Sequence, residues 1–378
     1  MDTATAQART DTAAKPARLP YIDNIKILLT ILVVMHHAGQ PYGPTGGRWP
    51  LTHAEHERML GPFFHVNASF FMALFFLISA YFLPRAYERK GAGKFLKDRF
   101  LRFGVPILFF GLIVFPVLFY LFDPKAASLP AFWFQSVIVE HKFEFAHLWF
   151  LSHLLAYAII YVILGRLGWL GERGVTPRRF PSNLAIGAYA AGLAMVSMVV
   201  RHWFPIDRWV FIGVPTELAH LPHYLSFFVI GILAYRFGWL QDIPRRTGQL
   251  WLAIGVTTVV FRFTYSAARW RFLRGPETTL DFIWNLWEAL LCVGMCLGLV
   301  YLFRARCNWQ GGFQRFLAAN AYGVYLFHLP MLVAIQFALE QTAYGPVTLT
   351  VISGIATLAA CYLLTAMLRW IPGVKRVL

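Results

Sequence analysis

About ten separate runs of some 20 mostly apolar residues dominate the chain, each long enough to cross the ~30 Å hydrocarbon core of a bilayer as a helix. A bilayer offers no water to backbone N–H and C=O groups, so such spans must be helices that bond internally. The sequence therefore predicts an all-α, polytopic integral membrane protein with about ten transmembrane helices. The runs lie near residues 22–40, 63–83, 103–123, 147–169, 183–202, 218–238, 249–266, 280–303, 316–340 and 347–370.

Composition excludes a soluble globular protein. The 378 residues are 58% hydrophobic and 14% charged, whereas an ordinary soluble domain is roughly 45–50% apolar and about 25% charged. A net charge of +16 would suggest a nucleic-acid partner in a soluble chain, but membrane topology explains it better here, and we expect no nucleic acid. The four cysteines form no CxxC pair, so we expect neither a disulfide framework nor a metal site.

Charge distribution predicts the topology. Most of the 34 Lys and Arg residues fall in alternate loops, and positive loops stay in the cytoplasm, so both termini are expected there. The cluster Arg262, Arg269, Arg271 and Arg274 falls on the opposite side and disagrees with this pattern. We expect a disordered cytoplasmic tail over 1–20, a single transmembrane domain over 21–372, and a short cytoplasmic tail over 373–378.

The first span carries the most informative polar set: Asp23, Lys26, His36 and His37. His37 lies eleven positions after Lys26, which places both on nearly one helix face about 16 Å apart. Asp23 lies one turn before Lys26 and can pair with it. A buried imidazole stays neutral and can accept a proton. The alternative, which spacing alone leaves equally open, is a lysine that reaches the headgroups and histidines at the interface.

A basic loop follows the second span and ends in Arg99 and Arg102. Two arginines three apart share a helix face, and guanidinium groups suit bidentate phosphate contacts, so a phosphorylated cytoplasmic cofactor could bind there. The positive-inside rule, together with attraction to anionic lipids, would alone explain most of this charge, and from the loop by itself it is the favoured reading. Three further residues in apolar spans are weaker candidates for lining a cavity, namely Trp149, Glu288 and His328.

Together these signals resemble the membrane-bound acyltransferase family 3. Lys26, ten intervening residues and His37 look like the signature of that family's first helix. FFLISAYFL is similar to its second-helix run, although Ala80 follows Ser79 where the family usually has glycine. Arg99-Phe-Leu-Arg102 matches the R-x-x-R that comes next.

Two later stretches, HLWFL around Trp149 and AYGVYLFHLP around His328, look like the family's remaining markers. The resemblance implies an acyl-CoA donor in the cytosol, bound with help from Arg99 and Arg102. It also implies that His37 serves as general base or carries the acyl group. Lys26, held by Asp23, would stabilise negative charge.

The predicted function is therefore an O-acyltransferase in the bacterial inner membrane, which moves an acetyl- or succinyl-class group onto a cell-surface or periplasmic carbohydrate or glycolipid. Candidates for lining its cavity are His36, Ser79, Trp149, Glu288 and His328. We expect a stand-alone member without a fused extracytoplasmic hydrolase-like (SGNH) domain. A secondary transporter is the competing class, because many spans and intramembrane charge also suit one.

Overall fold

The computed structural model describes residues 18–44, 49–51, 53, 55–121, 128–170, 174–264 and 277–378. Within them, eight helical segments are long and apolar enough to cross a membrane. The chain is therefore a polytopic, helical integral membrane protein, as its apolar runs predict. These segments are Pro20–Tyr42, Leu60–Tyr81, Leu83–Leu121, Ala146–Arg166, Asn183–Trp203, Asp281–Arg306, Gly312–Leu339 and Pro346–Leu368.

The sixth and seventh predicted spans are also helices, α9 (Leu221–Arg236) and α10 (Arg245–Thr264). Helix α10 packs closely on α12 (Glu277–Arg306) because glycines face each other where the two helices cross. A Cβ atom added at Gly255 would lie 2.7 Å from the backbone of Gly294. Small residues at such a crossing let two backbones approach in a membrane, where packing rather than the hydrophobic effect holds helices together.

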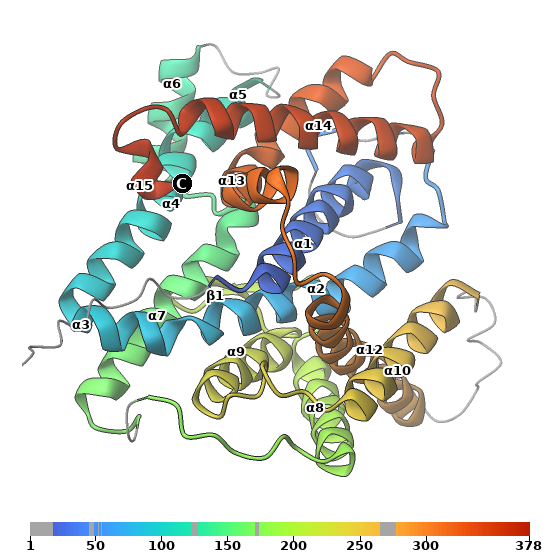
Figure 1. The fold of residues 1–378 in the computed structure, drawn as a ribbon. Coiled ribbons are helices and arrows are strands. Elements are labelled where there is room, and N and C mark those ends of the chain that lie inside the picture. Colours follow the sequence, from blue (N-terminus) through green and yellow to red (C-terminus); the bar gives the residue numbers. More distant parts are fainter. Residues whose placement is uncertain are drawn as a thin grey trace, which may run out of the picture.

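Helix α1 (Pro20–Gly39) lies in the middle of the bundle (Figure 1) and contacts α2 (Leu60–Tyr81), α12, α13 (Gly312–Leu339) and α14 (Pro346–Leu368). It begins with a proline and carries Asp23 in its first turn, both of which favour a helix N-terminus. It runs antiparallel to α2, since Lys26 lies over the Phe82 ring just past the end of α2, whereas His36 packs on Phe64 near its start. A polar stripe on α1 therefore passes through the centre of the protein.

The third predicted span belongs to a longer, bent arm over Leu83–Leu121. Its first part, α3 (Leu83–Arg99), bends at Gly91, whose φ of 68° is readily adopted by glycine. Two π-helical turns, Phe100–Gly104 and Phe110–Val114, interrupt the remainder around α4 (Val105–Phe109) and before α5 (Phe115–Leu121). Such turns widen a helix locally and are frequent at functional sites.

A short antiparallel hairpin between α8 (Asn183–Trp203) and α9 departs from the all-helical expectation. Its strands are β1 (Trp209–Phe211) and β2 (Pro215–Glu217), with Val210 opposite Thr216. The remaining described α-helices are α6 (Leu129–Trp133), α7 (Trp149–Arg166) and α15 (Val374–Val377). Short 3-10 turns lie at Gln40–Tyr42 and Ala146–Leu148, and a further π-helical turn lies at Phe134–Val139. The hairpin brings Trp209 and Glu217 to the bundle, which an apolar-run analysis has no means of predicting.

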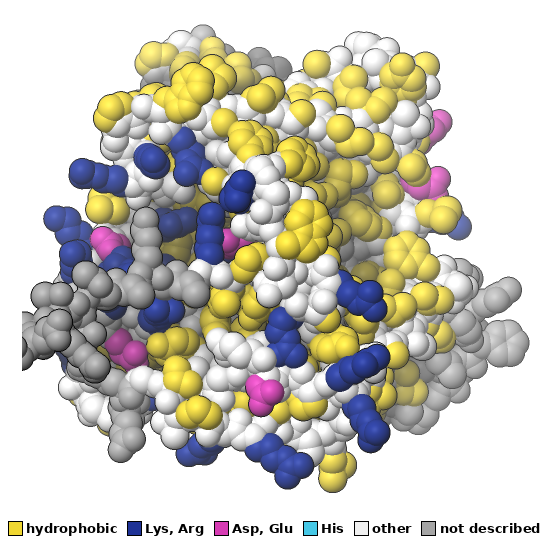
Figure 2. All heavy atoms as spheres, in the orientation of Figure 1, with side chains coloured by type: hydrophobic (Ala, Val, Ile, Leu, Met, Phe, Trp, Pro, Cys, Tyr) yellow, Lys and Arg dark blue, Asp and Glu magenta, His cyan; other side chains and the backbone are white. Residues whose placement is uncertain are grey.

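Basic residues gather at one end of the helices. Figure 2 shows Lys and Arg side chains over the left and lower parts of the face it presents, and apolar side chains along its upper edge over α14. Of the residues expected in terminal tails or the discordant cluster, 1–17, Arg269, Arg271 and Arg274 lie outside the described residues. The basic residues of the described loops and helix ends include Arg85, Arg89, Lys90, Lys94, Lys97, Arg236, Arg245, Arg246, Arg304, Arg306, Arg369, Lys375 and Arg376.

Candidate functional site

A cavity of 330 Å³, here called the histidine cavity, lies at the C-terminal end of α1. Its wall combines imidazoles from α1, α2 and the start of α7 with carboxylates from the β hairpin. It is concave and mixed in polarity, as ligand sites generally are. Its principal polar and aromatic lining residues are His36, His37, His65, His147, Trp149, Asp207, Trp209, Glu217, His220, Tyr224 and Tyr325.

The hydrogen bonds of His37 determine which of its nitrogens carries a proton. Nδ1 lies 2.9 Å from the carbonyl oxygen of Val33, which can only accept, so Nδ1 is the donor. His328 Nδ1 likewise donates to the carbonyl of Tyr325 at 2.7 Å, which leaves its Nε2 as an acceptor 3.3 Å from His37 Nδ1. Within the described residues, Nε2 of His37 has no hydrogen-bond partner. A neutral His37 therefore keeps the basic lone pair of Nε2 available to the cavity.

Two more histidines extend this group. His147 lines the histidine cavity, packs its ring 4.5 Å from that of His328 and donates from Nε2 to the carbonyl of Leu326 at 3.1 Å. His36 behaves differently, because its ring packs against Phe64 and Phe71, with centroids 5.1 and 5.3 Å away. Of the adjacent pair on α1, His37 is thus the one with a bonded, oriented ring.

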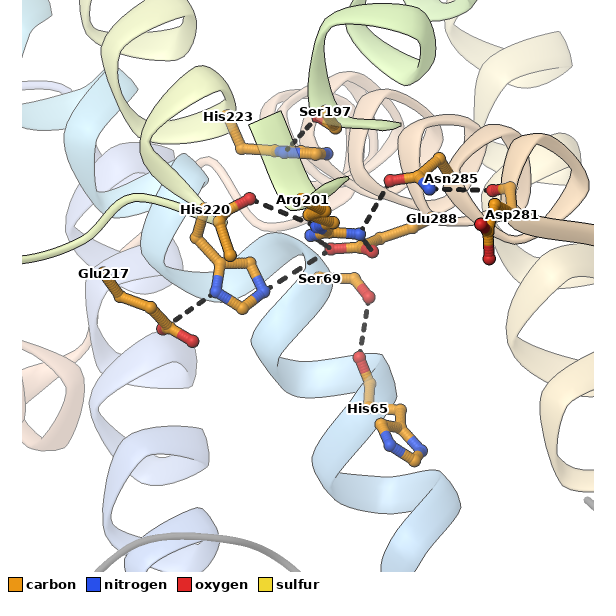
Figure 3. Close-up of polar contacts among 11 residues, drawn as sticks. His65, Ser69, Ser197, Arg201, Glu217, His220, His223, Asp281, Asn285 and Glu288 are labelled. Atoms are coloured by element: carbon orange, nitrogen blue, oxygen red, sulfur yellow. Dashed lines mark hydrogen bonds and ion pairs between the residues drawn. The ribbon is translucent and has the colours of Figure 1, made fainter. Parts of the chain in front are cut away.

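A buried ion pair supports the opposite wall of the histidine cavity (Figure 3). Arg201 on α8 pairs with Glu288 on α12 through both Nη atoms, and the side chains are only 9% and 5% exposed. Arg201 also donates to Asn285 at 2.9 Å and to the carbonyl of Ala219 at 3.2 Å. A buried pair with its remaining donors satisfied fixes α8 against α12.

His220 connects this ion pair to Glu217 of the hairpin. His220 Nε2 lies 3.7 Å from Glu288 and its Nδ1 lies 2.9 Å from Glu217, so the imidazole stands between the two carboxylates (Figure 3). Burial alone would raise the pKa of Glu217, but His220, the backbone N–H of Asp207 and Arg201 together lower it. Partial burial and the charge of Glu217 raise the pKa of Asp207.

A second cavity of 320 Å³, here called the arginine cavity, lies toward the N-terminal end of α1. Lys26 and Ser79 line it together with Arg99, the last residue of α3, and Arg102, which lies in the π-helical turn that follows. Arg99 lies over the rings of Phe95 and Phe103, and Arg102 lies over Tyr322. Among the described residues, neither arginine has a carboxylate within ion-pair distance.

Asp23 holds Lys26 as the spacing predicts. Its Oδ1 lies 3.5 Å from Lys26 Nζ, and its Oδ2 lies 3.4 Å from Arg18 Nε. Tyr325 lines both the arginine and the histidine cavities, and α1 contributes residues to both, so the two cavities adjoin at Tyr325.

The structure thus brings together most of the residues singled out in the sequence. Lys26, Ser79, Arg99 and Arg102 share the arginine cavity, while His36, His37 and Trp149 share the histidine cavity. His328 is fully buried and lies behind His37, and Glu288 lies behind His220, outside the lining of both cavities.

Sequence reasoning missed Asp207, Glu217 and Tyr325 as site residues. Asp207 and Glu217 lie in a loop that no apolar run marks. A positive φ of 68° at Asp207 is the local sign of a built turn, and it becomes visible only in the structure.

Comparison with known proteins places the chain among membrane acyltransferases. A family model described as an acyltransferase domain, Acyl_transf_3, matches residues 19–366. "Glucans biosynthesis protein C" of Escherichia coli strain K12 is 26% identical over 337 residues, which are 84% of this chain and 83% of that protein. The protein of the same name from Escherichia coli O81 (strain ED1a) matches with the same identity and coverage. No solved structure matches the chain.

Proposed function

Because the chain belongs to the acyltransferase 3 family, we propose that it transfers an acyl group from acyl-CoA to a hydroxyl of a glucan-type carbohydrate. The family implies an acyl donor, and the name of the Escherichia coli relatives refers to the biosynthesis of glucans. The donor enters on the cytoplasmic side and the acceptor on the other side of the inner membrane. Acetyl and succinyl are the acyl classes to test first.

The orientation of His37 carries the proposal. Its Nδ1 donates to the carbonyl of Val33, so the unprotonated Nε2 is available to the histidine cavity. A base held in one tautomer beside a cavity is what deprotonation of a hydroxyl requires. General-base catalysis of this kind contributes typically 10² to 10⁴ in rate.

The arginine cavity supplies the donor site. Arg99 and Arg102 present unpaired guanidinium groups, and Lys26 adds an ammonium held by Asp23. Guanidinium forks suit the phosphates of coenzyme A. These phosphates bring the negative charge that no described carboxylate supplies to Arg99 and Arg102. With the phosphates bound there, the pantetheine arm extends past Tyr325 toward His37.

The reaction then needs one group that takes a proton from the acceptor and passes it to the leaving thiolate. The acceptor oxygen attacks the thioester carbon while His37 Nε2 takes the hydroxyl proton, so a C–O bond forms. The C–S bond breaks as the tetrahedral intermediate collapses, and the proton passes from His37 to the departing CoA thiolate. A thioester is already activated, so positioning the two substrates accounts for much of the remaining rate.

Charge supports the proposed sidedness. The arginine cavity lies at the same end of the bundle as the described basic loops, and positive loops stay in the cytoplasm. Both termini are then cytoplasmic, and the histidine cavity faces the periplasm. Acyl-CoA and a periplasmic glucan would meet at His37 without either substrate crossing the bilayer.

The test measures release of CoA thiol by the purified protein in lipid nanodiscs, with acetyl-CoA or succinyl-CoA and an envelope glucan fraction. We expect release that depends on the glucan, together with a glucan mass increase of one acyl group. His37→Gln should lower kcat by about 10² to 10⁴. His202→Gln, which changes an exposed histidine at the end of α8, serves as the matched control.

Three results would overturn parts of the proposal. Absence of thiol release with every donor and glucan fraction would contradict acyl transfer from acyl-CoA. Normal glucan acylation by His37→Gln would remove His37 as the base. A stoichiometric burst of thiol without acceptor would replace direct transfer by an acyl-histidine intermediate.

A further inference from the structure

A third cavity of 920 Å³, here called the outer cavity, lies next to the histidine cavity. Trp149 on α7 and Trp209 on β1 line both of them, with ring centroids 5.5 Å apart and planes inclined by 67°. The two indoles therefore form the boundary between the cavities. The rest of the outer lining comes from the α4 region, the segment before α7 and the hairpin.

We propose that the outer cavity binds the acceptor as an extended oligosaccharide, with Trp149 and Trp209 stacking on its sugar rings and Asp207 accepting hydrogen bonds from its hydroxyls. This inference rests on the proposed function and names the part of the protein that selects the acceptor. The reacting hydroxyl lies in the histidine cavity, while the remainder of the chain continues outward past the indoles.

The chemistry of the wall fits a neutral sugar chain. Sugar rings present apolar C–H faces and a rim of hydroxyls, so they need flat aromatic surface beside hydrogen-bond acceptors. Trp149 also stacks on Tyr224, with centroids 5.4 Å apart at 29°, which holds the indole flat. Asp207 lines the histidine cavity, and in the described chain its carboxylate oxygens have no hydrogen-bond partner.

Of the two carboxylates near the hairpin, the one of Asp207 is the one available to a ligand. Glu217, the other carboxylate of this wall, already accepts from His220 at 2.9 Å and from the backbone N–H of Asp207 at 2.7 Å. The same contact fixes the Asp207 backbone at a φ of 68°. Glu217 thus positions the loop, while the carboxylate of Asp207 remains open to accept from hydroxyl groups.

The volumes of the two cavities favour an oligosaccharide acceptor over a single sugar. The outer cavity, at 920 Å³, lies near the upper end of the ~300–1,000 Å³ range of ligand pockets, whereas the histidine cavity, at 330 Å³, lies near its lower end. The smaller space suits the reacting sugar and the larger one suits several further rings. Affinity should therefore rise with the length of the acceptor.

An interfacial role is the alternative for an exposed tryptophan in a membrane protein. Trp203, at the end of α8, is 61% exposed and lines none of the three cavities, so it represents that role. Trp209 is 46% exposed but lies against Trp149 at the cavity boundary. Trp203→Leu is thus the matched control for Trp209→Leu.

The experiment measures the acceptor KM of the nanodisc protein for glucose oligomers of increasing length, in an α-1,4 series and a β-1,3 series from glucose to the heptasaccharide. For wild type and Trp203→Leu we expect KM to fall at least roughly tenfold from the monosaccharide to the longest oligomer in one series. Trp209→Leu should lose most of this length dependence, so that its KM for the longest oligomer rises toward its own KM for glucose, while its KM for acyl-CoA stays unchanged, because Trp209 does not line the arginine cavity. Asp207→Asn, nearly the same size, should raise the acceptor KM a few fold.

A wild-type KM independent of length, or an equal loss in Trp203→Leu and Trp209→Leu, would overturn the inference and leave acyl transfer intact. If neither series is acylated while an envelope glucan fraction supports thiol release, Trp209→Leu is compared with Trp203→Leu on that fraction, and equal KM values overturn the inference. Absence of thiol release with every acceptor would instead contradict the proposed function.

Discussion

The two cavities along α1 differ in how their charged side chains are paired. In the histidine cavity, the buried charge is paired within the protein, because Arg201 binds Glu288 and His220 stands beside Glu217. In the arginine cavity, Arg99 and Arg102 lie over aromatic rings, and no described carboxylate lies within ion-pair distance of either. Apart from the exposed carboxylate of Asp207, the charges around the histidine cavity are paired within the protein, whereas the arginine cavity carries excess positive charge.

This difference indicates what each cavity binds. A site with unpaired guanidinium groups in a low-dielectric surrounding gains most from a ligand that brings negative charge. A site whose own charges are balanced suits a neutral ligand that offers hydroxyl groups, since no net charge has to be compensated. An anionic acyl-CoA and a neutral carbohydrate match these two requirements.

The largest effect should come from breaking the internal balance of the histidine cavity. Arg201→Met leaves Glu288 buried without its cation, and removing one partner of a buried pair typically costs 3–5 kcal/mol. We expect a marked loss of thermal stability, measured as Tm by tryptophan fluorescence in detergent. Arg201→Met/Glu288→Met, which removes both charges, should recover much of that loss. A single variant as stable as wild type would show that this pair does not hold the wall.

The next largest effect tests the unbalanced cavity. Arg99→Gln/Arg102→Gln should raise the KM for acyl-CoA by about 10², since each charge-assisted bond to phosphate is worth roughly 1.5–3 kcal/mol. The acceptor KM should not change, because the two cavities bind different substrates. Arg85→Gln/Arg89→Gln, on exposed positions of α3, is the control for general loss of positive charge. An equal effect in both double variants would assign the arginines to lipid contact instead.

The sequence predicts the arginine cavity better than the histidine cavity. Lys26, Arg99 and Arg102 are charged residues next to apolar runs, and charge at membrane depth stands out against an apolar background. The spans themselves follow from length and hydropathy alone. What the sequence could not predict is the bend at Gly91 and the π-helical turn in the segment from which Arg99 and Arg102 line the cavity.

The histidine cavity depends on contacts between residues far apart in the chain. His37 and His328 are 291 positions apart and Arg201 and Glu288 are 87 apart, and no periodicity within one helix encodes either pair. Glu217 ends the second strand of a hairpin of two three-residue strands, and Asp207 lies in the turn just before the first. Such short strands carry no alternation strong enough to recognise. Single residues were therefore predictable here, but their partners were not.

His328 allows a smaller, more specific test within the histidine cavity. It accepts from His37 Nδ1 and is itself fixed by the carbonyl of Tyr325. His328→Gln should lower kcat by about tenfold and leave both KM values unchanged, because Val33 still orients His37. The kcat–pH profile should also shift, since the amide oxygen of glutamine is a weaker acceptor for His37 Nδ1 than the imidazole nitrogen of His328. A profile and kcat like those of wild type would restrict His328 to core packing.

The smallest effect concerns the one carboxylate in the histidine cavity that is left for a ligand. Partial burial and the charge of Glu217 raise the pKa of Asp207, whereas the contacts of Glu217, chiefly with His220, lower the pKa of that residue despite its burial. As the pH falls, Asp207 is therefore protonated first, and a protonated carboxyl accepts fewer hydrogen bonds from hydroxyls. Acceptor binding should weaken a few fold as the pH falls through the raised pKa of Asp207, at a higher pH than an ordinary Asp near 3.9 would give.

Binding without turnover separates this effect from titration of the base. The dissociation constant of a glucose heptasaccharide, measured by calorimetry on the His37→Gln variant between about pH 4 and 7, should rise on acidification. For His37→Gln/Asp207→Asn, the dissociation constant should be larger at neutral pH and should change little with pH, because the amide does not titrate. Because Glu217 and His220 face Asp207 in both variants, a persisting slope in the double variant would assign the titration to one of them. The open acceptor of the histidine cavity would then be Glu217, and its charges would be less completely paired than the arrangement around His220 indicates.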